Sequence, residues 1–177
     1  MLDRLKAKIR GTIDITRLLN DGLKAGKNLS IQEGVIIDPG HCWLIEIGDN
    51  VTLAPRVHIL AHDASTKQAL GYTRIGRVTI GNNVFIGAST VVLPNVHIGD
   101  NVIIGAGSIV SKDLPSDGVY LGQPCYKVAD YDEWVQKQKK KMDDSPVFDS
   151  SYIIGTITAE KKQEMINLLS DGIGYIV

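Results

Sequence analysis

Aliphatic residues recur at every sixth position through the middle of the chain. They are Ile80, Ile86, Val92, Ile98, Ile104 and Val110. A second small or apolar residue stands two positions before each of them, at Val78, Val84, Thr90, Val96, Val102 and Ser108. Because side chains alternate between the two faces of a strand, positions two apart point the same way. Each six-residue unit therefore predicts a short strand and a corner, and the repeated units predict a β-helix with an aliphatic interior.

The same spacing continues upstream, with one irregular member and one long interruption. The earlier positions are Leu29, Val35, His41, Ile47, Leu53 and Ile59, and His41 is the polar residue that does not fit. Between Ile59 and Ile80 the step is longer by about 15 residues, so we expect residues 60–77 to leave the coil as an extruded loop. A loop of this length in so regular a pattern is usually functional.

The corners carry their own signal. Asn50, Asn83 and Asn101 each follow an aliphatic repeat position by three residues. A corner there needs a left-handed backbone, which Asn and Gly tolerate best. Strands and corners therefore predict the same fold, an all-β core in which each buried Ile or Val contributes about 1.5–3 kcal/mol.

The segments on either side of the repeats read differently. Apolar residues at helical spacing predict a helical cap over residues 1–28, and they are Leu2, Leu5, Ile9, Ile15, Leu18, Leu19 and Leu23. The repeats occupy residues 29–128, and residues 129–177 form a mixed α/β tail. In this tail we expect helices at Asp130–Met142 and from Ala159 to Ser170, a strand at Tyr152–Ile157 and a last apolar piece, Tyr175–Val177, with Thr158 and Gly172 bounding the second helix.

Composition narrows the class of protein. The 177 residues are 44% hydrophobic, yet they contain no apolar run of about 18 residues that would predict a membrane span. The first residues lack the basic-then-apolar order of a secretory signal, so we expect a cytoplasmic protein. A net charge of −1 argues against nucleic acid as the main partner. Cys42 and Cys125 have no metal-binding spacing and are expected to be structural thiols.

Four stretches of this sequence resemble the hexapeptide-repeat acetyltransferases: Ile47–Pro55, Val78–Gly87, Ile98–Asp113 and Gly122–Cys125. The closest similarity is to the galactoside, maltose and nodulation-factor O-acetyltransferases and their surface-polysaccharide relatives, and it covers about residues 26–128. The resemblance implies a left-handed parallel β-helix with three sides and coils of about 18 residues. It also implies a homotrimer with acetyl-CoA as cosubstrate between neighbouring subunits, and no metal is expected.

The resemblance makes His62 the catalytic candidate, because the family has a histidine at the start of the extruded loop as general base. An alcohol is a poor nucleophile at neutral pH, and an imidazole has the basicity to accept its proton during attack. A carboxylate orients the ring by accepting from its other nitrogen. Asp63 and Asp38 are the two candidates for this role.

The resemblance also assigns residues to acetyl-CoA. Small residues at corners match positions where the pantetheine arm runs close to the coil, and a hydroxyl–lysine pair and a further lysine match positions near the nucleotide end. These residues are Gly87, Ala88, Gly105, Ala106, Ser111, Lys112 and Lys127. A backbone N–H near such a corner would stabilise the oxyanion. Alternatively, the corner alone requires the small residues.

The acceptor candidates lie at an early corner. Asp38, His41 and Trp43 offer an aromatic face beside polar groups, which suits the apolar C–H faces and the hydroxyls of a sugar. Packing at the base of the coil is the alternative. We therefore interpret the chain as an O-acetyltransferase for a carbohydrate hydroxyl, such as that of a surface polysaccharide or its precursor, with serine, an amino sugar or a xenobiotic as alternative acceptors.

Two other classes of protein stay open. His58, His62 and His97 supply the three histidines of a zinc carbonic anhydrase of the γ class, which uses the same fold. They come from different coils, which argues against a shared metal ion. A non-catalytic β-helix scaffold is the other alternative, but it needs neither His62 at a long loop nor Ser111 and Lys112 after the coils.

Overall fold

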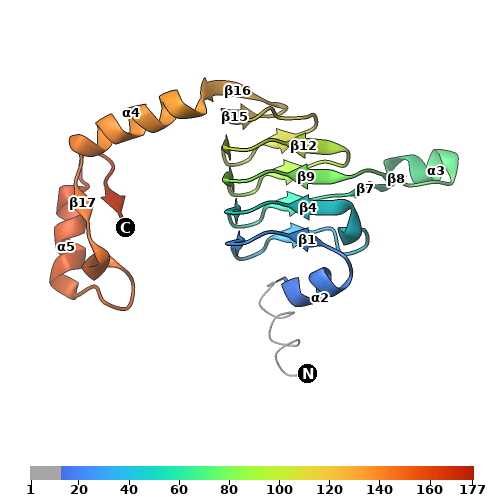
Figure 1. Ribbon diagram of the computed structural model, residues 1–177. Coiled ribbons are helices and arrows are strands. Elements are labelled where there is room, and N and C mark those ends of the chain that lie inside the picture. Colours follow the sequence, from blue (N-terminus) through green and yellow to red (C-terminus); the bar gives the residue numbers. More distant parts are fainter. Residues whose placement is uncertain (1–12) are drawn as a thin grey trace. The chain divides into compact units, whose positions relative to one another are not determined.

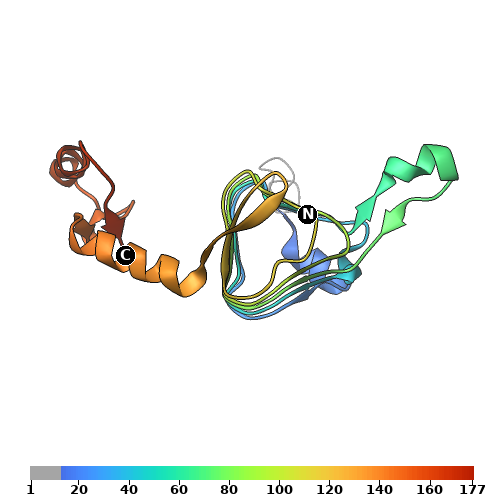
Figure 2. The same cartoon turned by 90° about the horizontal axis from the view of Figure 1, so that it is seen from above.

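Short strands stack to form the three sides of a β-helix, seen from the side in Figure 1 and from above in Figure 2. The computed structural model describes residues 13–177, in one unit that ends at Tyr131 and a second unit, Asp132–Val177. Sheet A contains β1 (Lys24–Ala25), β4 (Ile45–Ile47), β9 (Val78–Ile80) and β12 (Val96–Ile98). Sheet B contains β2 (Ser30–Ile31), β5 (Thr52–Leu53), β10 (Val84–Ile86), β13 (Val102–Ile104), β15 (Gly118–Gly122) and β16 (Cys125–Asp130). Sheet C contains β3 (Ile36–Ile37), β6 (His58–Ile59), β11 (Val91–Val92) and β14 (Ile109–Val110).

The predicted aliphatic rows form the core. Ile80 of β9 pairs in register with Ile47 of β4 on one side and with Ile98 of β12 on the other, and all three side chains are buried. Parallel pairing in register places equivalent side chains of successive coils above one another, because neighbouring strands lie about 4.8 Å apart. The six-residue period is thus confirmed from Ile45 onward, and Ile104 and Val110 are fully buried as expected.

Asparagine ladders hold the corners between sheets A and B. Asn50, Asn83 and Asn101 have φ angles of 56°, 55° and 52°, which confirms the predicted left-handed backbone. Each side-chain amide donates to the next corner: Asn50 to Asn83 at 3.0 Å, Asn83 to Asn101 at 3.0 Å, and Asn101 to Asp117 at 2.8 Å. In the ladder these side chains form hydrogen bonds with one another instead of with water, and these bonds link one coil to the next.

The predicted phase of the repeat is wrong upstream of β4. Ile37, rather than His41, pairs with Ile59 and fills the row of buried side chains at that position. Leu29 and Val35 lie two positions before Ile31 and Ile37, the residues that pair with Leu53 and Ile59. The corner between Ile37 and Ile45 is longer than the equivalent corner between Val92 and Val96, and it contains the 3₁₀ helix η1 (Cys42–Leu44). His41 begins this helix as its N-cap residue, so it lies in a corner rather than in a strand.

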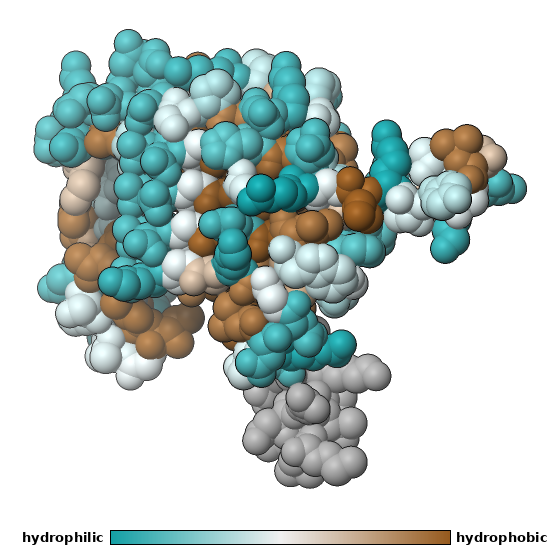
Figure 3. Space-filling model, turned by 45° about the vertical axis from the view of Figure 1, so that its right-hand side comes forward, coloured by the Kyte–Doolittle hydropathy of each residue, from teal (hydrophilic) through white to brown (hydrophobic). Residues whose placement is uncertain are grey.

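The extruded loop is a short arm that leaves the coil after β6. It consists of β7 (His62–Asp63), η2 (Ala64–Thr66), α3 (Lys67–Leu70) and β8 (Arg74–Ile75). β7 and β8 pair antiparallel at its base. Figure 3 shows hydrophobic surface in brown on the arm. The exposed large hydrophobic residues of the arm are Leu70, Tyr72 and Ile75. The arm leaves from the same corner, between sheets C and A, that is enlarged in the preceding coil.

Residues on both sides of the coil cover its ends. α2 (Ile15–Asn20) is capped by the Asp14 side chain, and its Leu18 packs into the core with Leu23. The predicted helical cap is therefore present in part, although β1 already begins within the segment 1–28. Leu2, Leu5 and Ile9 lie outside the described residues. At the other end, β15 and β16 form an antiparallel hairpin on the last coil.

The second unit contains α4 (Tyr131–Asp143), β17 (Val147–Phe148), η3 (Ser150–Tyr152), α5 (Ala159–Leu168) and β18 (Tyr175–Ile176), with α4 contributing all but its first residue. Both predicted helices are confirmed, and Thr158 caps α5 by accepting from Lys161 N–H. The strand predicted at Tyr152–Ile157 is wrong, because Asp149 accepts from Ser151 N–H and starts η3 there. Within residues 13–177 no helix combines the length and the apolar character needed to cross a membrane.

Candidate active site

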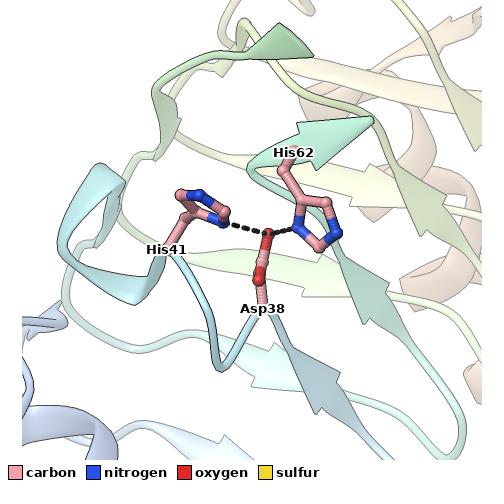
Figure 4. A group of neighbouring side chains, drawn as sticks. All are labelled: Asp38, His41 and His62. Carbon is pink, nitrogen blue, oxygen red and sulfur yellow. Dashed lines mark hydrogen bonds and ion pairs between the residues drawn. The ribbon is translucent and has the colours of Figure 1, made fainter. Parts of the chain in front are cut away.

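A buried carboxylate lies at the enlarged corner that follows β3. The Asp38 side chain has no exposed surface, and Gly40 N–H donates to its Oδ1 at 3.0 Å. Its Oδ2 accepts from Ala61 N–H at 3.0 Å and lies in a close hydrogen bond with Nδ1 of His62 (Figure 4). Asp38 and His62 meet because they occupy the same corner in successive coils, which stack about 4.8 Å apart.

The hydrogen bonds determine the charge of this carboxylate. Burial raises the pKa of the Asp38 carboxyl, but the hydrogen bonds from His62, Ala61 N–H and Gly40 N–H lower it more, so the net pKa falls below its ordinary value. Asp38 is therefore ionised at neutral pH and can only accept hydrogen bonds. It follows that Nδ1 of His62 carries the proton of the neutral ring and that Nε2 has a free lone pair.

The ring of His41 lies beside His62, and the ring of Trp43 lies beside His41. The His41 ring centroid is 5.0 Å from that of His62 and 5.4 Å from that of Trp43. Nδ1 of His41 lies 3.8 Å from Oδ2 of Asp38, too far for a hydrogen bond. The indole of Trp43 is 56% exposed. The three predicted acceptor residues are thus grouped with the predicted base, with Asp38 buried beneath the partly exposed rings of His41 and His62.

Asp63, the other candidate for orienting His62, has different partners. Its carboxylate pairs with Arg74 across the base of the arm and accepts from Ser65 N–H at 2.8 Å. The Arg74 hydrogen bond lowers the pKa of Asp63 to about 2. Asp63 thus links β7 to β8, whereas Asp38 holds the imidazole.

Six of the seven predicted cofactor residues lie at two different corners of the coil. Gly87–Ala88 and Gly105–Ala106 follow β10 and β13, between sheets B and C. Ser111 and Lys112 follow β14, between sheets C and A, which is the corner of His62. Lys127 lies on β16 and donates to Asp130 at 2.6 Å.

Glycine at position 87 has a structural reason of its own. A Cβ atom there would lie 2.5 Å from the backbone nitrogen of Ala106 in the next coil. Stacking of the coils therefore requires glycine here, in agreement with the alternative that the corner alone requires the small residues. A cofactor contact at the same corner remains compatible with this requirement.

A cleft of about 320 Å³ lies where the arm joins the coil. Its lining residues are Asp63, Arg74, Ile75, Leu93, Pro94, Asn95 and Ser111. Only Asp63 and Ser111 were singled out from the sequence. The others lie on the returning strand of the arm and at the corner of the following coil, and their proximity depends on how these two segments meet.

The histidines of the zinc alternative are not brought together. His58 lies on sheet C and His97 on sheet A, where Nδ1 of His97 is 2.6 Å from the Thr79 hydroxyl. Within the described part of the chain, the residues close enough to share a metal ion are instead Asp38, His41 and His62.

Comparisons with known proteins agree with the repeat architecture. Residues 77–112 match the family model "Bacterial transferase hexapeptide (six repeats)". Protein CapG of Staphylococcus aureus is 42% identical over 99 residues, which are 54% of this chain and 58% of CapG. The crystal structure of a maltose O-acetyltransferase from Clostridium difficile is 30% identical with a TM-score of 0.54, and the match covers 72% of this chain and 83% of that one.

A galactoside acetyltransferase in complex with coenzyme A is also similar. It is 31% identical, with a TM-score of 0.52, and the match covers 64% of this chain and 67% of that one. The chain spans only 42% to 66% of the length of the curated relatives that it matches.

Proposed function

The chain belongs to the hexapeptide-repeat family of bacterial transferases, and on this basis we propose that it is an acyltransferase that moves an acetyl group from acetyl-CoA to a hydroxyl. The observation that carries the proposal is the contact between buried, ionised Asp38 and Nδ1 of partly exposed His62. It leaves Nε2 of His62 as a proton acceptor. Two relatives named galactoside O-acetyltransferase, and the galactoside acetyltransferase solved with coenzyme A, support the same reaction.

In the proposed reaction, Nε2 of His62 removes the proton of the acceptor hydroxyl as its oxygen attacks the acetyl carbonyl. The resulting imidazolium is stabilised by the Asp38 carboxylate, which pairs with its Nδ1–H. When the tetrahedral intermediate collapses, the carbon–sulfur bond breaks and the leaving thiolate takes the proton from Nε2. The products are an acetyl ester and free CoA, and His62 returns to its starting state.

The assembly that we propose is a homotrimer of left-handed β-helices with acetyl-CoA between subunits. In one subunit, Ser111 and Lys112 share the corner of His62, but Gly87 and Gly105 lie at another corner. This separation supports a site completed by a second copy of the chain. Exposed apolar residues on the arm also support a contact between subunits. Light scattering that gives a monomer mass at micromolar concentration would contradict this assembly.

For the acceptor, we propose a carbohydrate hydroxyl. The exposed indole of Trp43 lies beside His41, which in turn lies beside His62, so a sugar stacked on Trp43 would be near the base. Apolar stacking of this kind is worth about 0.5–1.5 kcal/mol. Trp43→Ala should therefore raise the KM for a sugar several-fold and leave the KM for acetyl-CoA unchanged.

The experiment that tests the proposal measures CoA release with purified protein, acetyl-CoA and a panel of sugars, nucleotide sugars, serine and amines. Faster transfer to serine or to an amine than to every sugar would defeat the carbohydrate acceptor. His62→Ala should lower kcat by about two to four orders of magnitude. Its KM for acetyl-CoA should hardly change.

His58→Ala is the matched control for His62→Ala, since His58 lies in the strand that leads to the arm and makes no contact with Asp38 among the hydrogen bonds of the described residues. It should retain wild-type kcat. Full activity in His62→Ala, or an equal loss in His58→Ala, would show that His62 is not the base.

A further inference from the structure

Three potential metal ligands converge on one point of the site. Asp38, His41 and His62 each have a ligand atom within 4.8 Å of those of the other two. Nδ1 of His62 is hydrogen-bonded to Oδ2 of Asp38, and Nδ1 of His41 lies near the same oxygen. Figure 4 shows both imidazoles turned toward the same carboxylate oxygen from opposite sides. The two rings come from different coils, so the convergence is a property of the tertiary structure.

His41 is the member of this group that the proposed reaction leaves unexplained. Its Nδ1 atom is buried and has no hydrogen-bond partner in the described structure. The atom lies 3.8 Å from Oδ2 of Asp38, beyond hydrogen-bond distance. Leaving a buried polar atom unpaired is unfavourable. A ligand that sits between this nitrogen and the carboxylate would satisfy it.

We propose that Asp38, His41 and His62 form a binding site for a divalent transition-metal ion, with Zn²⁺ the best fit, and that the bound ion inhibits the enzyme. Two imidazole nitrogens and one carboxylate oxygen are a usual ligand set for Zn²⁺ with a fourth position for water. Mg²⁺ and Ca²⁺ prefer oxygen ligands and are disfavoured by the two nitrogens.

One separation between ligand atoms is already close to what Zn²⁺ requires. With bonds of about 2.0–2.2 Å in a tetrahedron, ligand atoms lie roughly 3.3–3.6 Å apart. The separation of 3.8 Å between His41 Nδ1 and Asp38 Oδ2 is near this value. His62 must give up its hydrogen bond to Asp38 and move outward slightly. The side chains of His41 and His62 are 30% and 39% exposed, so both rings can move toward solvent to admit an ion to the buried Nδ1 of His41 and to Asp38.

Inhibition follows from the position of the ring proton, and this step rests on the proposed function. When the metal takes the lone pair of Nδ1, the proton of the neutral His62 ring must reside on Nε2. The atom that should accept the hydroxyl proton is then a donor. The ion also occupies Asp38, which the imidazolium would need as a partner. The metal is therefore an inhibitor rather than a cofactor.

Titration of chelator-treated, tag-free protein with Co²⁺ tests the site without any activity measurement. We expect one Co²⁺ per chain, with the intense visible absorption of a four-coordinate ion, and displacement by Zn²⁺. His41→Gln and His62→Asn should each weaken binding by roughly 10- to 100-fold or more. His97→Gln, which alters a histidine outside the group, should bind as the wild type does. Thermal unfolding shows whether each variant is folded.

No stoichiometric Co²⁺ binding by the wild-type protein would overturn the site. Equal binding by folded His41→Gln would overturn it as well, since the ion would then lie elsewhere. In the activity assay, Zn²⁺ should suppress acetyl transfer and a chelator should restore it. His41→Gln should need a correspondingly higher Zn²⁺ concentration, measured against its own uninhibited rate. Tight binding of Co²⁺ without inhibition would refute the inhibitory role and the assignment of His62 as base, but not the metal site.

Discussion

Replacing Asp38 by Asn tests the carboxylate–imidazole pair most directly, because it removes a charge and preserves the shape of the side chain. Three donors point at Asp38: Gly40 N–H, Ala61 N–H and Nδ1–H of His62. An Asn offers one oxygen and one amino group. With the oxygen in the place of Oδ2, two of the three hydrogen bonds survive and the amino group faces Gly40 N–H. The reverse orientation loses the bond from Ala61 and the correct tautomer of His62, so the first orientation is favoured.

The size of the effect follows from this arrangement. Gly40 N–H, on an exposed residue, loses its hydrogen bond to a charged acceptor, which should lower the free energy of unfolding by about 1.5–3 kcal/mol. The imidazolium of His62 also loses its negative partner. At an effective dielectric constant near 20, such a charge pair is worth about 2–4 kcal/mol. Since each 1.36 kcal/mol is a factor of ten in rate, kcat of Asp38→Asn should fall by about 30- to 1,000-fold.

The assay is steady-state kinetics at saturating acetyl-CoA, with thermal unfolding to establish that the variant is folded. Asp100→Asn is a matched control, because the Asp100 carboxylate accepts from Asn82 N–H at 2.6 Å on a different corner. It should lose stability and retain kcat. The double variant Asp38→Asn/His62→Ala should be no slower than His62→Ala alone, since the two groups act as a unit. A kcat within threefold of wild type in folded Asp38→Asn, or fully multiplicative losses in the double variant, would refute the reasoning.

Three other outcomes are expected. Asn83→Ala should lower the free energy of unfolding by about 2–4 kcal/mol, because the alanine loses two ladder hydrogen bonds and must hold a left-handed backbone. Asn83→Gly loses the hydrogen bonds alone and should be less destabilised. A lower urea midpoint for Asn83→Gly than for Asn83→Ala would contradict this. Ile104→Asp should give insoluble protein, since it places an unpaired carboxylate in the fully buried core, and soluble folded protein would mean that the side chain faces outward. The pKa of Asp63 is lowered from 3.8 to about 2, so the contribution of Asp63 to stability is complete above pH 3.8 and is lost as the pH falls toward 2. The substitution Arg74→Gln should shift the Asp63 pKa back toward 3.8, as measured by NMR titration. A wild-type pKa near 3.8 would disprove the pairing with Arg74.

Local features of this protein were readable from its sequence. The six-residue period identified the strands because strand alternation depends only on neighbouring residues. Asn50, Asn83 and Asn101 identified left-handed corners because the backbone angles of a residue depend mainly on its own side chain. The arm was visible as an interruption of the period, and Thr158 identified the start of α5.

Errors arose where the local signal was weak or ambiguous. Leu29 and Val35 are apolar, and so are Ile31 and Ile37 two residues later, so the sequence pattern fits either set. Only pairing with the next coil identifies Ile37 as the partner of Ile59. The apolar residues of Tyr152–Ile157 have strand propensity, but Asp149 caps the 3₁₀ helix η3, which takes the place of the start of that strand.

The candidate site shows the same division between local and tertiary information. The sequence by itself made His62 the candidate base, because the histidine stands at the start of the loop in a recognisable motif. It could not choose between Asp63, the adjacent residue, and Asp38, which is 24 positions earlier. The tertiary structure decided that choice, because a coil returns to the same corner after each turn and stacks Asp38 against Ala61 and His62. Adjacent residues of a strand point to opposite faces, so the neighbour in sequence turns to Arg74 and the neighbour in space holds the imidazole.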